Sequence, residues 1–374
     1  MTLKEEIIIR KYREDDKKQI IDLLDTIYGG WPKQDIEGLN TAFWEWKYEE
    51  RPKPSLISVA EHNSKVVGMV HARQLDIKII EEVYPCTTTG DLAVHKDYRG
   101  MGLSKKLGME SNRNLRRKEG TVLDYFIVGN PILVKSFERS RPKFPVEVIN
   151  LVKIEDISLH FEKNHSNKAW YLKFGYRALS SLNNLMNYSS VPSSNDSIIV
   201  SEVKKFHENV NDFWVEIADD YDLIVERTKS VLNYRYCHEK NPKYTVLQAT
   251  CNGNIQGFIV LRINSYNKNY PVGYIIDLLG LKGEDKVIHT LLQEGLIYFK
   301  KKGINLVNIQ LPKGHPYVKI ANAHGFLDSR VRLHIFYIPA GDFDPIEGNY
   351  FNPERVYLSW GDHDVLPASK PGYE

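Results

Sequence analysis

The second half of this chain repeats the pattern of the first half. The segment FWEWKYEERPKPSLISVAEHNSKVVGMVHAR can be laid over VLNYRYCHEKNPKYTVLQATCNGNIQGFIVLR. The aligned pairs are Trp46 with Tyr234, Tyr48 with Tyr236, Pro54 with Pro242 and Gly68 with Gly257. A repeat of this length predicts two copies of one domain rather than a solenoid of short units. The chain has 374 residues, which is enough for two domains of ordinary size.

The first copy shows the element order of an α/β domain. A β-branched run at 7–9 predicts a strand, and the apolar stripe at 20–24 predicts a helix after it. The aromatic segment TAFWEWKYEERPKPS predicts a helix that prolines end, and two β-rich runs around residues 62–64 predict a hairpin. The strand TTTGDLAVH then leads through a glycine-rich turn and a helix to the strand TVLDYFIVGN, as in a βαβ unit.

The two copies differ at that glycine-rich turn. GDLAV aligns with IDLLG, which pairs Asp91 with Asp277. Asp91 lies 29 positions before Gly120, whereas Asp277 lies only 26 positions before Gly303. The segment HKDYRGMG of the first copy corresponds to LKGED in the second. We therefore expect only the first copy to hold a ligand at this turn.

Composition excludes several classes of protein. Lysine and arginine number 50 against 48 acidic residues, so no strong overall field favours nucleic acid or a membrane surface. Three scattered cysteines predict neither a disulfide framework nor a zinc site. The start MTLKEEIIIRKYRED shows no apolar signal region, and no apolar run reaches the length of a membrane span. We expect a cytoplasmic protein that binds neither nucleic acid nor membrane.

The turn itself, DYRGMGLSKKL, points to an anion. Gly100 and Gly102 come just before a helix, whose first backbone N–H groups have no partner within the helix. Glycine lets a phosphate approach these groups closely, and Arg99 can add charge-assisted hydrogen bonds. The spacing is not that of a Walker loop, and Lys105 stands where the dinucleotide fingerprint needs a third glycine. Gly-x-Gly alone equally fits a tight turn that needs glycine for steric reasons.

The stretch VHKDYRGMGLS resembles motif A of the GCN5-related N-acetyltransferases (GNAT). The matching positions are Val94, Arg99, Gly102 and Ser104, with serine where the family has glycine or alanine. The resemblance implies two tandem GNAT-like domains, each a mixed, mostly antiparallel sheet flanked by helices, the second lacking the phosphate loop. It also implies acetyl-CoA, or another acyl-CoA, as co-substrate.

The resemblance assigns cofactor-binding residues. The backbone amides of six consecutive residues, Arg99, Gly100, Met101, Gly102, Leu103 and Ser104, are expected to hold the pyrophosphate. In this family the strand before the loop splays from its neighbour, so Leu92 and Val94 are expected to pair with pantetheine through their backbones. The Val94 N–H is then expected to polarise the thioester carbonyl. Asn130 is expected to contact pantetheine, although it equally fits a turn residue before Pro131.

The catalytic groups are less well marked. Asp91 is a candidate base, but its counterpart Asp277 stands in the copy without a loop, which favours a structural role such as an ion pair. Glu45 and His71 are further candidates. Family members often use a tyrosine as the acid on the helix after Asn130, and Phe137 stands near that place, so Ser136 or a water is the expected substitute.

These observations predict a tandem acyltransferase with an active first copy. We expect an N-terminal domain at 1–150, a helical or linker segment at 151–195, a C-terminal domain at 196–340 and a tail at 341–374, which either docks across the domains or frays. The expected acceptor is an amine on a small molecule, sugar or peptide. Two alternatives remain. One is an aminoacyl transferase of the FemABX type, against which the intact RGMG argues, and the other is a non-catalytic CoA-sensing or interaction protein.

Overall fold

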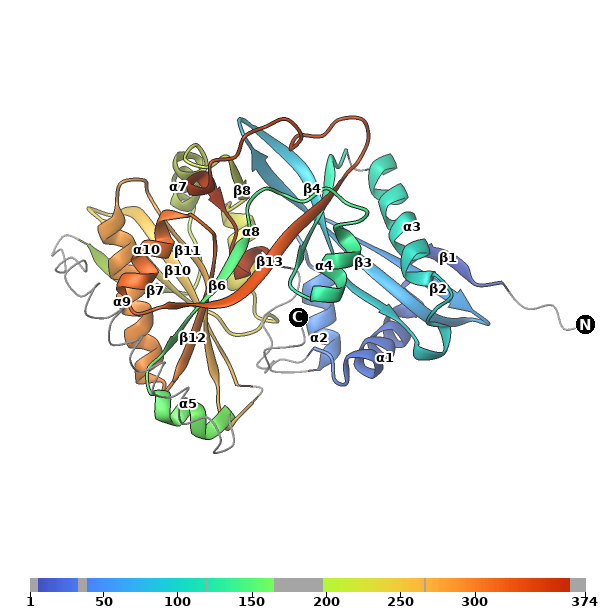
Figure 1. The fold of residues 1–374 in the computed structure, drawn as a ribbon, viewed down its shortest axis with the longest axis horizontal. Coiled ribbons are helices and arrows are strands. Elements are labelled where there is room, and N and C mark those ends of the chain that lie inside the picture. The colour runs from blue at the N-terminus through green and yellow to red at the C-terminus, as the bar shows by residue number, and fades with distance from the viewer. Residues whose placement is uncertain (1–5, 33–38, 119, 165–197, 266, 364–374) are drawn as a thin grey trace, which may run out of the picture.

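The computed structural model describes residues 6–32, 39–118, 120–164, 198–265 and 267–363. Within these ranges fourteen strands form one continuous mixed sheet with helices on its faces (Figure 1). Twelve of them follow the order β1-β2-β3-β4-β5-β13-β6-β12-β11-β10-β9-β7, while β8 pairs with β3 and β14 pairs with β8. Most neighbours are antiparallel, and the predicted fold class is confirmed.

The first copy contains these elements: β1 Ile8–Lys11, α1 Lys17–Tyr28, α2 Asn40–Trp44 with a π-helical turn Glu45–Glu49, β2 Ser55–His62, β3 Lys65–Ile79, β4 Glu82–Val94, α3 Leu103–Lys118, β5 Leu123–Val128 and α4 Pro131–Phe137. Then follow β6 Val148–Ile154 and α5 Ile157–Asn164. The second copy contains these: β7 Ile199–Val203, α7 Asn209–Ala218, β8 Leu223–Val225, α8 Lys229–Tyr236, β9 Thr245–Cys251, β10 Asn254–Asn264, β11 Val272–Gly280, α9 Asp285–Lys301, β12 Leu306–Pro312, α10 Pro316–Ala323, β13 Leu327–Pro339 and β14 Val356–Tyr357.

Local sequence explains the first elements. The apolar stripe of α1 buries Ile20 and Leu24 completely, and the helix ends at Gly29 in the left-handed conformation. Between β2 and β3, Asn63 and Ser64 both have positive φ (53° and 59°), as a two-residue hairpin turn of this hand requires. The predicted helix and hairpin are therefore confirmed.

Corresponding helices of the two copies pack against each other. Trp46, which follows α2, aligns in sequence with Tyr234 of α8, and the two rings stack with their centroids 5.7 Å apart. The Trp46 indole N–H donates to the Tyr234 carbonyl (3.0 Å), and the Tyr234 hydroxyl donates to the Trp46 carbonyl (2.7 Å). Because these aligned residues contact each other, the two copies pack together with approximate two-fold symmetry.

The copies exchange strands across this junction. β13 lies late in the second copy, yet its C-terminal part pairs with β5 of the first copy from His334–Val128 to Pro339–Leu123. Conversely, β6 pairs with β12 of the second copy along its whole length. Figure 1 shows β13 running from one half of the molecule into the other. The predicted domain limit at residue 150 falls inside β6, so the sequence boundary is not a boundary of the sheet.

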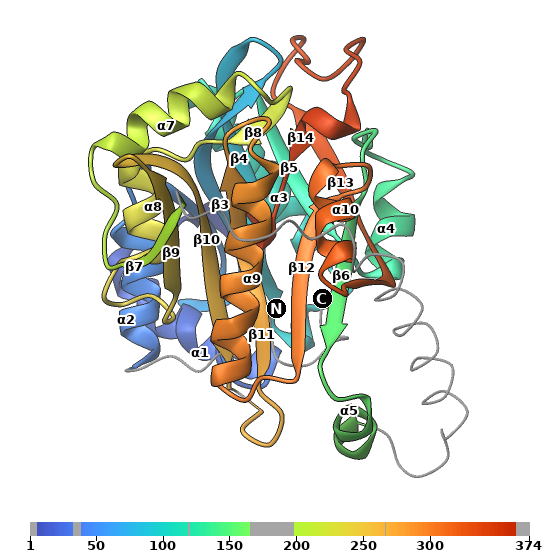
Figure 2. The same ribbon diagram turned by 90° about the vertical axis from the view of Figure 1, so that its left-hand side faces the viewer.

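The two faces of the first-copy sheet carry different helices. Met69 of β3 packs in a cluster with α1 and with Trp44 of α2, and the next residue, Val70, packs with Leu103 and Leu107 of α3. Alternation along β3 therefore places His71 and Arg73 on the α1–α2 face. Figure 2, turned by 90°, shows the corresponding arrangement in the second copy, with α9 lying along β10 and β11.

The described end of the tail docks between the halves. The Asp362 carbonyl accepts hydrogen bonds from Arg73 (2.9 Å) and from Tyr125 (3.0 Å), both in the first-copy sheet. Its carboxylate pairs with Arg227 of the second copy (2.9 Å). The docked alternative is thus confirmed up to residue 363, while residues 364–374 lie outside the described residues. Of the predicted helical or linker segment at 151–195, residues 151–164 contain the end of β6 and α5, and the remainder lies outside the described residues. No helix in the described ranges is long and apolar enough to cross a bilayer.

We expect the aligned glycines Gly257 and Gly68 to differ in their tolerance of alanine. A Cβ on Gly257 meets the Leu279 carbonyl oxygen at 2.5 Å and must push backbone aside, whereas a Cβ on Gly68 first meets the Leu107 side chain at 3.2 Å. Gly257→Ala should lower the free energy of unfolding by about 1–3 kcal/mol, and Gly68→Ala should lower it by less than half as much. Urea titration followed by circular dichroism measures both, and equal losses would contradict the register of β10 against β11.

Candidate active site

The candidate site begins where β4 and β5 stop pairing. These parallel strands are joined only from Cys86–Leu123 to Thr88–Tyr125. Beyond that point β4 continues beside β3, and β5 continues beside β13. The two strands therefore diverge in the segments 89–94 and 126–128, which we call the first gap. The splayed strands expected from the family resemblance are present.

A bulge in β4 shapes this gap. β3 pairs Met69 with Ala93 and His71 with Gly90, which leaves two residues of β4 opposite one of β3. The two residues of β4 in the bulge are Asp91 and Leu92, and Asp91 has a positive φ of 44°. A bulge bends its strand and re-aims the side chains beside it. The Leu92 side chain is 44% exposed, and the Leu92 carbonyl accepts a hydrogen bond from the Tyr28 hydroxyl (3.2 Å).

The glycine-rich turn connects the end of β4 to α3. Gly100 and Gly102 have φ of 81° and 72°, which side chains with a Cβ rarely adopt. A Cβ built on either glycine meets nothing within 4 Å. The turn therefore needs glycine for its backbone conformation, as the steric alternative expected. No neighbouring part of the chain crowds these glycines, so a close contact is not the reason for them. The backbone in front of α3 is open, and the first N–H groups of a sixteen-residue helix face that space.

The other residues of the turn take different positions. Met101 is 53% exposed and Ser104 is exposed, whereas the Leu103 side chain is buried in the core beside Leu107. Leu103 can therefore serve a ligand only through its backbone N–H. The Arg99 Nε lies 3.5 Å from the Val94 carbonyl oxygen, so this guanidinium stays close to the end of β4.

Asp91, the first candidate base, is buried and held by two donors. Lys47 and the Tyr48 hydroxyl both donate to its Oδ2. The Tyr48 ring in turn packs edge-on against His71, with centroids 4.4 Å apart, and the His71 Nε2 lies 3.2 Å from the Ser55 hydroxyl. His71 is fully buried. The ion pair that the sequence offered as the structural alternative for Asp91 is therefore present.

The second copy repeats this carboxylate–tyrosine contact. Asp277 accepts hydrogen bonds from the Tyr236 hydroxyl (2.9 Å) and from Arg227 (2.8 Å). Tyr236 and Asp277 are the sequence partners of Tyr48 and Asp91, and both pairs are in contact. This tyrosine–aspartate contact is present in both copies, although only the first copy has the glycine turn. Its presence in both favours a structural role, in which the aspartate holds its strand to the helical segment that carries the tyrosine.

The structure does not bring the other catalytic candidates to Asp91. The Glu45 carboxylate pairs with Lys240 of the second copy (2.8 Å) and with Lys17 (3.4 Å). The hydrogen bond from Lys240 lowers the pKa of Glu45, which makes it a poorer base. Ser136 is exposed on α4, which packs through Phe137 against Phe126. The three candidates proposed from sequence therefore do not form one catalytic group, because two of them lie on helices with other contacts.

Asn130 has an assigned structural task. Its Oδ1 accepts hydrogen bonds from the backbone N–H groups of Ile132 (2.9 Å) and Leu133 (3.4 Å), which caps α4. The turn interpretation of Asn130 is therefore correct for this oxygen, and a contact with a cofactor would fall to its amide nitrogen.

One group at the base of the gap was missed by the sequence reasoning. Asp124 lies on β5 at the rung Thr87–Asp124, and it accepts hydrogen bonds from the hydroxyls of Thr87 (2.9 Å) and Thr89 (2.8 Å). Burial raises the pKa of the Asp124 carboxyl to about 7. Thr89 is the first residue of β4 beyond the last paired rung. The Asp124 carboxyl, with its pKa near neutrality, is therefore connected to the start of the gap by a single hydrogen bond from the Thr89 hydroxyl.

The second copy contains a corresponding gap, but side chains close it. β11 and β12 pair only from Val272–Leu306 to Ile275–Ile309, and they diverge beyond that point. The Tyr357 hydroxyl accepts from the Leu278 N–H (2.9 Å) and lies 2.7 Å from the Leu278 carbonyl. The Tyr317 hydroxyl likewise accepts from the Gly280 N–H (3.2 Å). Leu278 and Gly280 align with Leu92 and Val94, so tyrosines occupy the backbone groups that pantetheine is expected to use in the first copy.

Metal chemistry has no candidate in the part of the chain that the structure describes. No group of three or more His, Cys, Asp or Glu side chains there is placed to hold a metal ion.

Comparisons with known proteins agree with this architecture. Residues 8–127 match the family model described as an acetyltransferase (GNAT) domain. A probable N-acyltransferase from Enterococcus faecalis V583 has 12% identity and a TM-score of 0.60, covering 90% of this chain and 73% of its own. N-myristoyltransferase of Saccharomyces cerevisiae, with bound myristoyl-CoA and inhibitors, has 12% identity and a TM-score of 0.62, covering 96% and 86%.

A tandem GNAT protein from the clavulanic acid biosynthesis pathway is also similar. It has 14% identity and a TM-score of 0.56, covering 91% of this chain and 100% of its own. At these identities the likeness concerns the fold, and the tandem arrangement is shared. A search of curated proteins found no matching sequence.

Replacing Asp124 by asparagine should flatten the pH dependence of stability. The raised pKa means that the folded state holds a proton more tightly than the unfolded state, so the wild-type free energy of unfolding falls as pH rises from about 4 to about 7. Between pH 5 and pH 8 the titration of this one group lowers the wild-type free energy of unfolding by about 3 kcal/mol. Denaturant titrations at several pH values measure the slope, and an Asp124→Asn variant with the wild-type slope would contradict the assignment.

Proposed function

We propose that this chain, which carries a GNAT domain over residues 8–127, is an acyl-CoA-dependent N-acyltransferase that works in its first copy. One contrast supports this proposal. The gap between β4 and β5 ends at an open glycine turn, whereas the equivalent gap of the second copy is closed by Tyr357 and Tyr317. We further propose acetyl-CoA as the donor and an amine of a small molecule, sugar or peptide as the acceptor.

The first copy offers a cradle for the diphosphate of coenzyme A. The peptide N–H groups from Arg99 to Ser104 lie at the start of α3, where the helix dipole favours negative charge. The space in front of Gly100 and Gly102 accepts a bulky anion, because a Cβ on either residue would meet nothing within 4 Å. The Arg99 guanidinium can add charge-assisted hydrogen bonds from the end of β4.

The backbone of β4 would hold the pantetheine arm. In the aligned strand of the second copy, the groups of Leu278 and Gly280 take tyrosine hydroxyls as partners. Buried peptide groups need such partners, since an unmade hydrogen bond in a protein interior is unfavourable by roughly 1–3 kcal/mol. In the first copy the Leu92 carbonyl accepts from the Tyr28 hydroxyl, and the Val94 carbonyl lies 3.5 Å from the Arg99 Nε. Pantetheine would therefore pair with the peptide N–H groups of Leu92 and Val94.

Acyl transfer in this gap requires the chain to align the thioester with the amine and to move protons. When bound, the acyl thioester supplies the carbon that an amine attacks, with release of the thiol. The Val94 N–H would stabilise negative charge on the carbonyl oxygen, as in an oxyanion hole. Asp124 and the Thr89 hydroxyl would hold a proton at the base of the gap, where Asp124 exchanges it near neutral pH. Asp91, bound by Lys47 and Tyr48, would fix the bulge.

One alternative has a specific observation in its favour. Asp91 is engaged in an ion pair, and Phe137 stands where family members often place an acidic tyrosine. A protein that binds coenzyme A without acyl transfer would also fit these two facts. Such a sensor would bind acetyl-CoA but would release no thiol with any amine, whereas an aminoacyl transferase of the FemABX type would not bind acetyl-CoA at the glycine turn.

The setting that we propose is the cytoplasm. The three cysteines, Cys86, Cys237 and Cys251, are free thiols, which is typical of a reducing compartment.

Gly102→Glu should abolish stabilisation by acetyl-CoA, and Gly283→Glu is its matched control. Both glycines have positive φ (72° and 79°) and open space around them, so both variants carry similar backbone strain and the same added charge. Only Gly102 lies in the proposed phosphate cradle. At a concentration 100 times the Kd, acetyl-CoA should stabilise the wild type and Gly283→Glu by about 2.7 kcal/mol and should not stabilise Gly102→Glu.

Thermal unfolding with and without acetyl-CoA measures this effect. Thiol release with a panel of amines then separates an enzyme from a sensor. Retention of the stabilisation in Gly102→Glu, or its loss in Gly283→Glu, would contradict the placement of the cofactor.

A further inference from the structure

We propose that Tyr28, the last residue of α1, is the general acid that protonates the leaving thiolate. The inference rests on the proposed acyltransferase function and adds a catalytic residue to it. When an amine displaces a thioester, the electron pair of the broken C–S bond stays on sulfur, so a proton donor beside the sulfur lowers the barrier. The Tyr28 hydroxyl donates to the Leu92 carbonyl (3.2 Å), in the strand that forms one wall of the first gap.

The Leu92 carbonyl faces the first gap. The His95 N–H donates to the Val67 carbonyl of β3 (2.8 Å), so the Ala93 N–H, two residues earlier, also faces β3. In a planar trans peptide the C=O and N–H groups point in opposite directions, so the Leu92 carbonyl points away from β3. Beyond the last rung with β5, this side of β4 is the first gap. The Tyr28 hydroxyl therefore lies at the gap.

The second copy shows what a hydroxyl at this carbonyl can reach. Leu278 aligns with Leu92, and the Tyr357 hydroxyl lies 2.7 Å from the Leu278 carbonyl oxygen and 2.9 Å from the Leu278 nitrogen. A hydroxyl in this position therefore contacts the backbone groups that line a gap. Tyr357 is fully buried and closes its gap, whereas Tyr28 is 36% exposed. In the first copy the same kind of contact thus comes from a side chain that is open to solvent.

The hydroxyl is close to the expected position of the thioester. The proposed oxyanion donor, the Val94 N–H, lies two residues beyond Leu92 on the same side of β4. Two residues of a strand span roughly 7 Å, and the Leu92 carbonyl lies within that span. A thioester whose carbonyl accepts from Val94 would therefore have its sulfur near the Tyr28 hydroxyl.

The contact between Tyr28 and Leu92 is a weak one. O–H···O hydrogen bonds are normally about 2.5–3.0 Å long, so the 3.2 Å contact is easily exchanged for a better one. A thiolate is a better acceptor than a neutral carbonyl, because charge-assisted hydrogen bonds are shorter and stronger. Charge that develops on sulfur would therefore draw the hydroxyl proton away from the carbonyl.

The helix after β5 does not bring a proton donor to the gap through its inner side. Phe137 is the residue of α4 that packs inward, against Phe126 and Phe336, and a phenyl ring has no proton to give. Ser136, the substitute that the sequence suggested, is exposed on α4. We therefore assign the proton transfer to Tyr28 rather than to Ser136.

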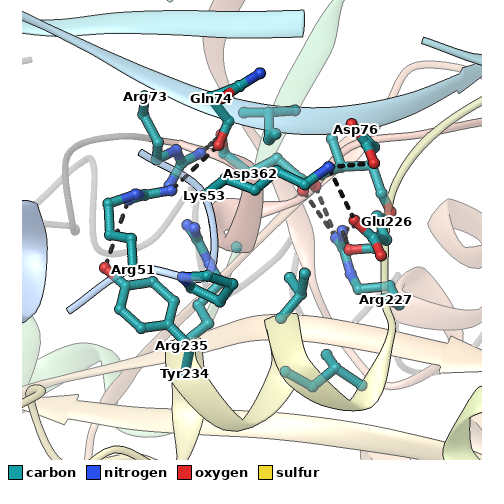
Figure 3. A pocket seen from close by; sticks show the side chains of 16 residues that line it. Arg51, Lys53, Arg73, Gln74, Asp76, Glu226, Arg227, Tyr234, Arg235 and Asp362 are labelled. Atoms are coloured by element: carbon teal, nitrogen blue, oxygen red, sulfur yellow. Dashed lines mark hydrogen bonds and ion pairs between the residues drawn. The ribbon is translucent and has the colours of Figure 1, made fainter. Parts of the chain in front are cut away.

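Other tyrosines near the junction of the two copies have different partners. The Tyr48 and Tyr125 hydroxyls are buried in hydrogen bonds to Oδ2 of Asp91 and to the Asp362 carbonyl. Tyr234 lies beside Arg51 (Figure 3), and its hydroxyl donates to the Trp46 carbonyl (2.7 Å). These hydroxyls hold elements together away from the backbone of the first gap.

The proton balance closes within the reaction. The amine nitrogen bonds to the acyl carbon, the C–S bond breaks, and its electron pair leaves on sulfur. Tyr28 gives its proton to the sulfur, which departs as the thiol. The nitrogen carries one proton too many after the attack, and that proton returns to the Tyr28 oxygen through water. One proton thus moves from nitrogen to sulfur, and no other reactant is consumed.

Tyr28→Phe tests the proposal, and Tyr234→Phe is its matched control. Each variant keeps the ring and removes one hydroxyl that donates to a backbone carbonyl. The full-length protein is assayed for thiol release with acetyl-CoA and the best acceptor from a panel of amino acids, amino sugars, polyamines and dipeptides. Tyr28→Phe should lower kcat by about 100-fold or more and leave the KM values and the stabilisation by acetyl-CoA within about threefold of the wild type. Tyr234→Phe should keep kcat within about threefold.

A second donor separates proton transfer from a structural role. A selenolate is a weaker base than a thiolate and leaves with less help from an acid. With the selenoester analogue of acetyl-CoA, the loss of kcat caused by Tyr28→Phe should be at least about tenfold smaller than with acetyl-CoA. A hydroxyl that only holds β4 in place would give the same loss with both donors.

The inference is overturned if Tyr28→Phe keeps the wild-type kcat, if it lowers kcat equally with both donors, or if its main effect is weaker binding of acetyl-CoA. In each of these cases thiol release by the wild type leaves the proposed function standing. A wild type that releases no thiol with any amine of the panel would overturn the proposed function, and the inference with it.

Discussion

The rest of the site depends on the backbone pairing between β4 and β5, which stops at the rung Thr88–Tyr125. Beyond this rung the bulge at Asp91 keeps β4 bent, and β13 takes the free edge of β5. The edge of β5 that would otherwise be exposed is thereby covered by a strand of the other copy. The strand exchange and the first gap are thus two consequences of the same arrangement, and neither copy can form its complete sheet without the other.

The two copies show what a gap of this kind requires. Peptide groups along its wall need hydrogen-bond partners, and in the second copy Tyr357 and Tyr317 supply hydroxyls to Leu278 and Gly280. The second copy also lacks the glycine turn, so it has neither the open turn nor the unoccupied strand backbone on which the proposed cofactor site depends. It contacts the first copy through the pairing of β12 with β6 and through Tyr234 of α8, which exchanges hydrogen bonds with Trp46.

Local patterns in the sequence predicted local features well. The repeat, the hairpin at Asn63–Ser64 and the open turn at Gly100–Gly102 all follow from spacing and residue type. Contacts between distant segments did not follow. Glu45 pairs with Lys240, 195 positions away, and β13 reaches β5 across the whole second copy. Such pairings depend on which edge of a sheet is left free, and a single sequence does not record that.

The candidate catalytic residues illustrate the same limit. Asp91 was found because its strand resembles that of a family, yet its role depends on Lys47, which comes from a different element. Asp124 was missed because a single carboxylate in the apolar strand LDYFIV gives no signal until Thr87 and Thr89 are placed beside it. Burial, which changes the protonation of such a group, is a property of the whole fold rather than of the segment.

The most direct test of the central claim is a crystal structure of the full chain with coenzyme A bound. We expect one molecule per chain, with its diphosphate on the backbone N–H groups of residues 99–104 and its pantetheine arm between β4 and β5. A molecule bound instead between β11 and β12, with Tyr357 and Tyr317 displaced, would contradict it. So would a first gap that stays closed while coenzyme A occupies another surface.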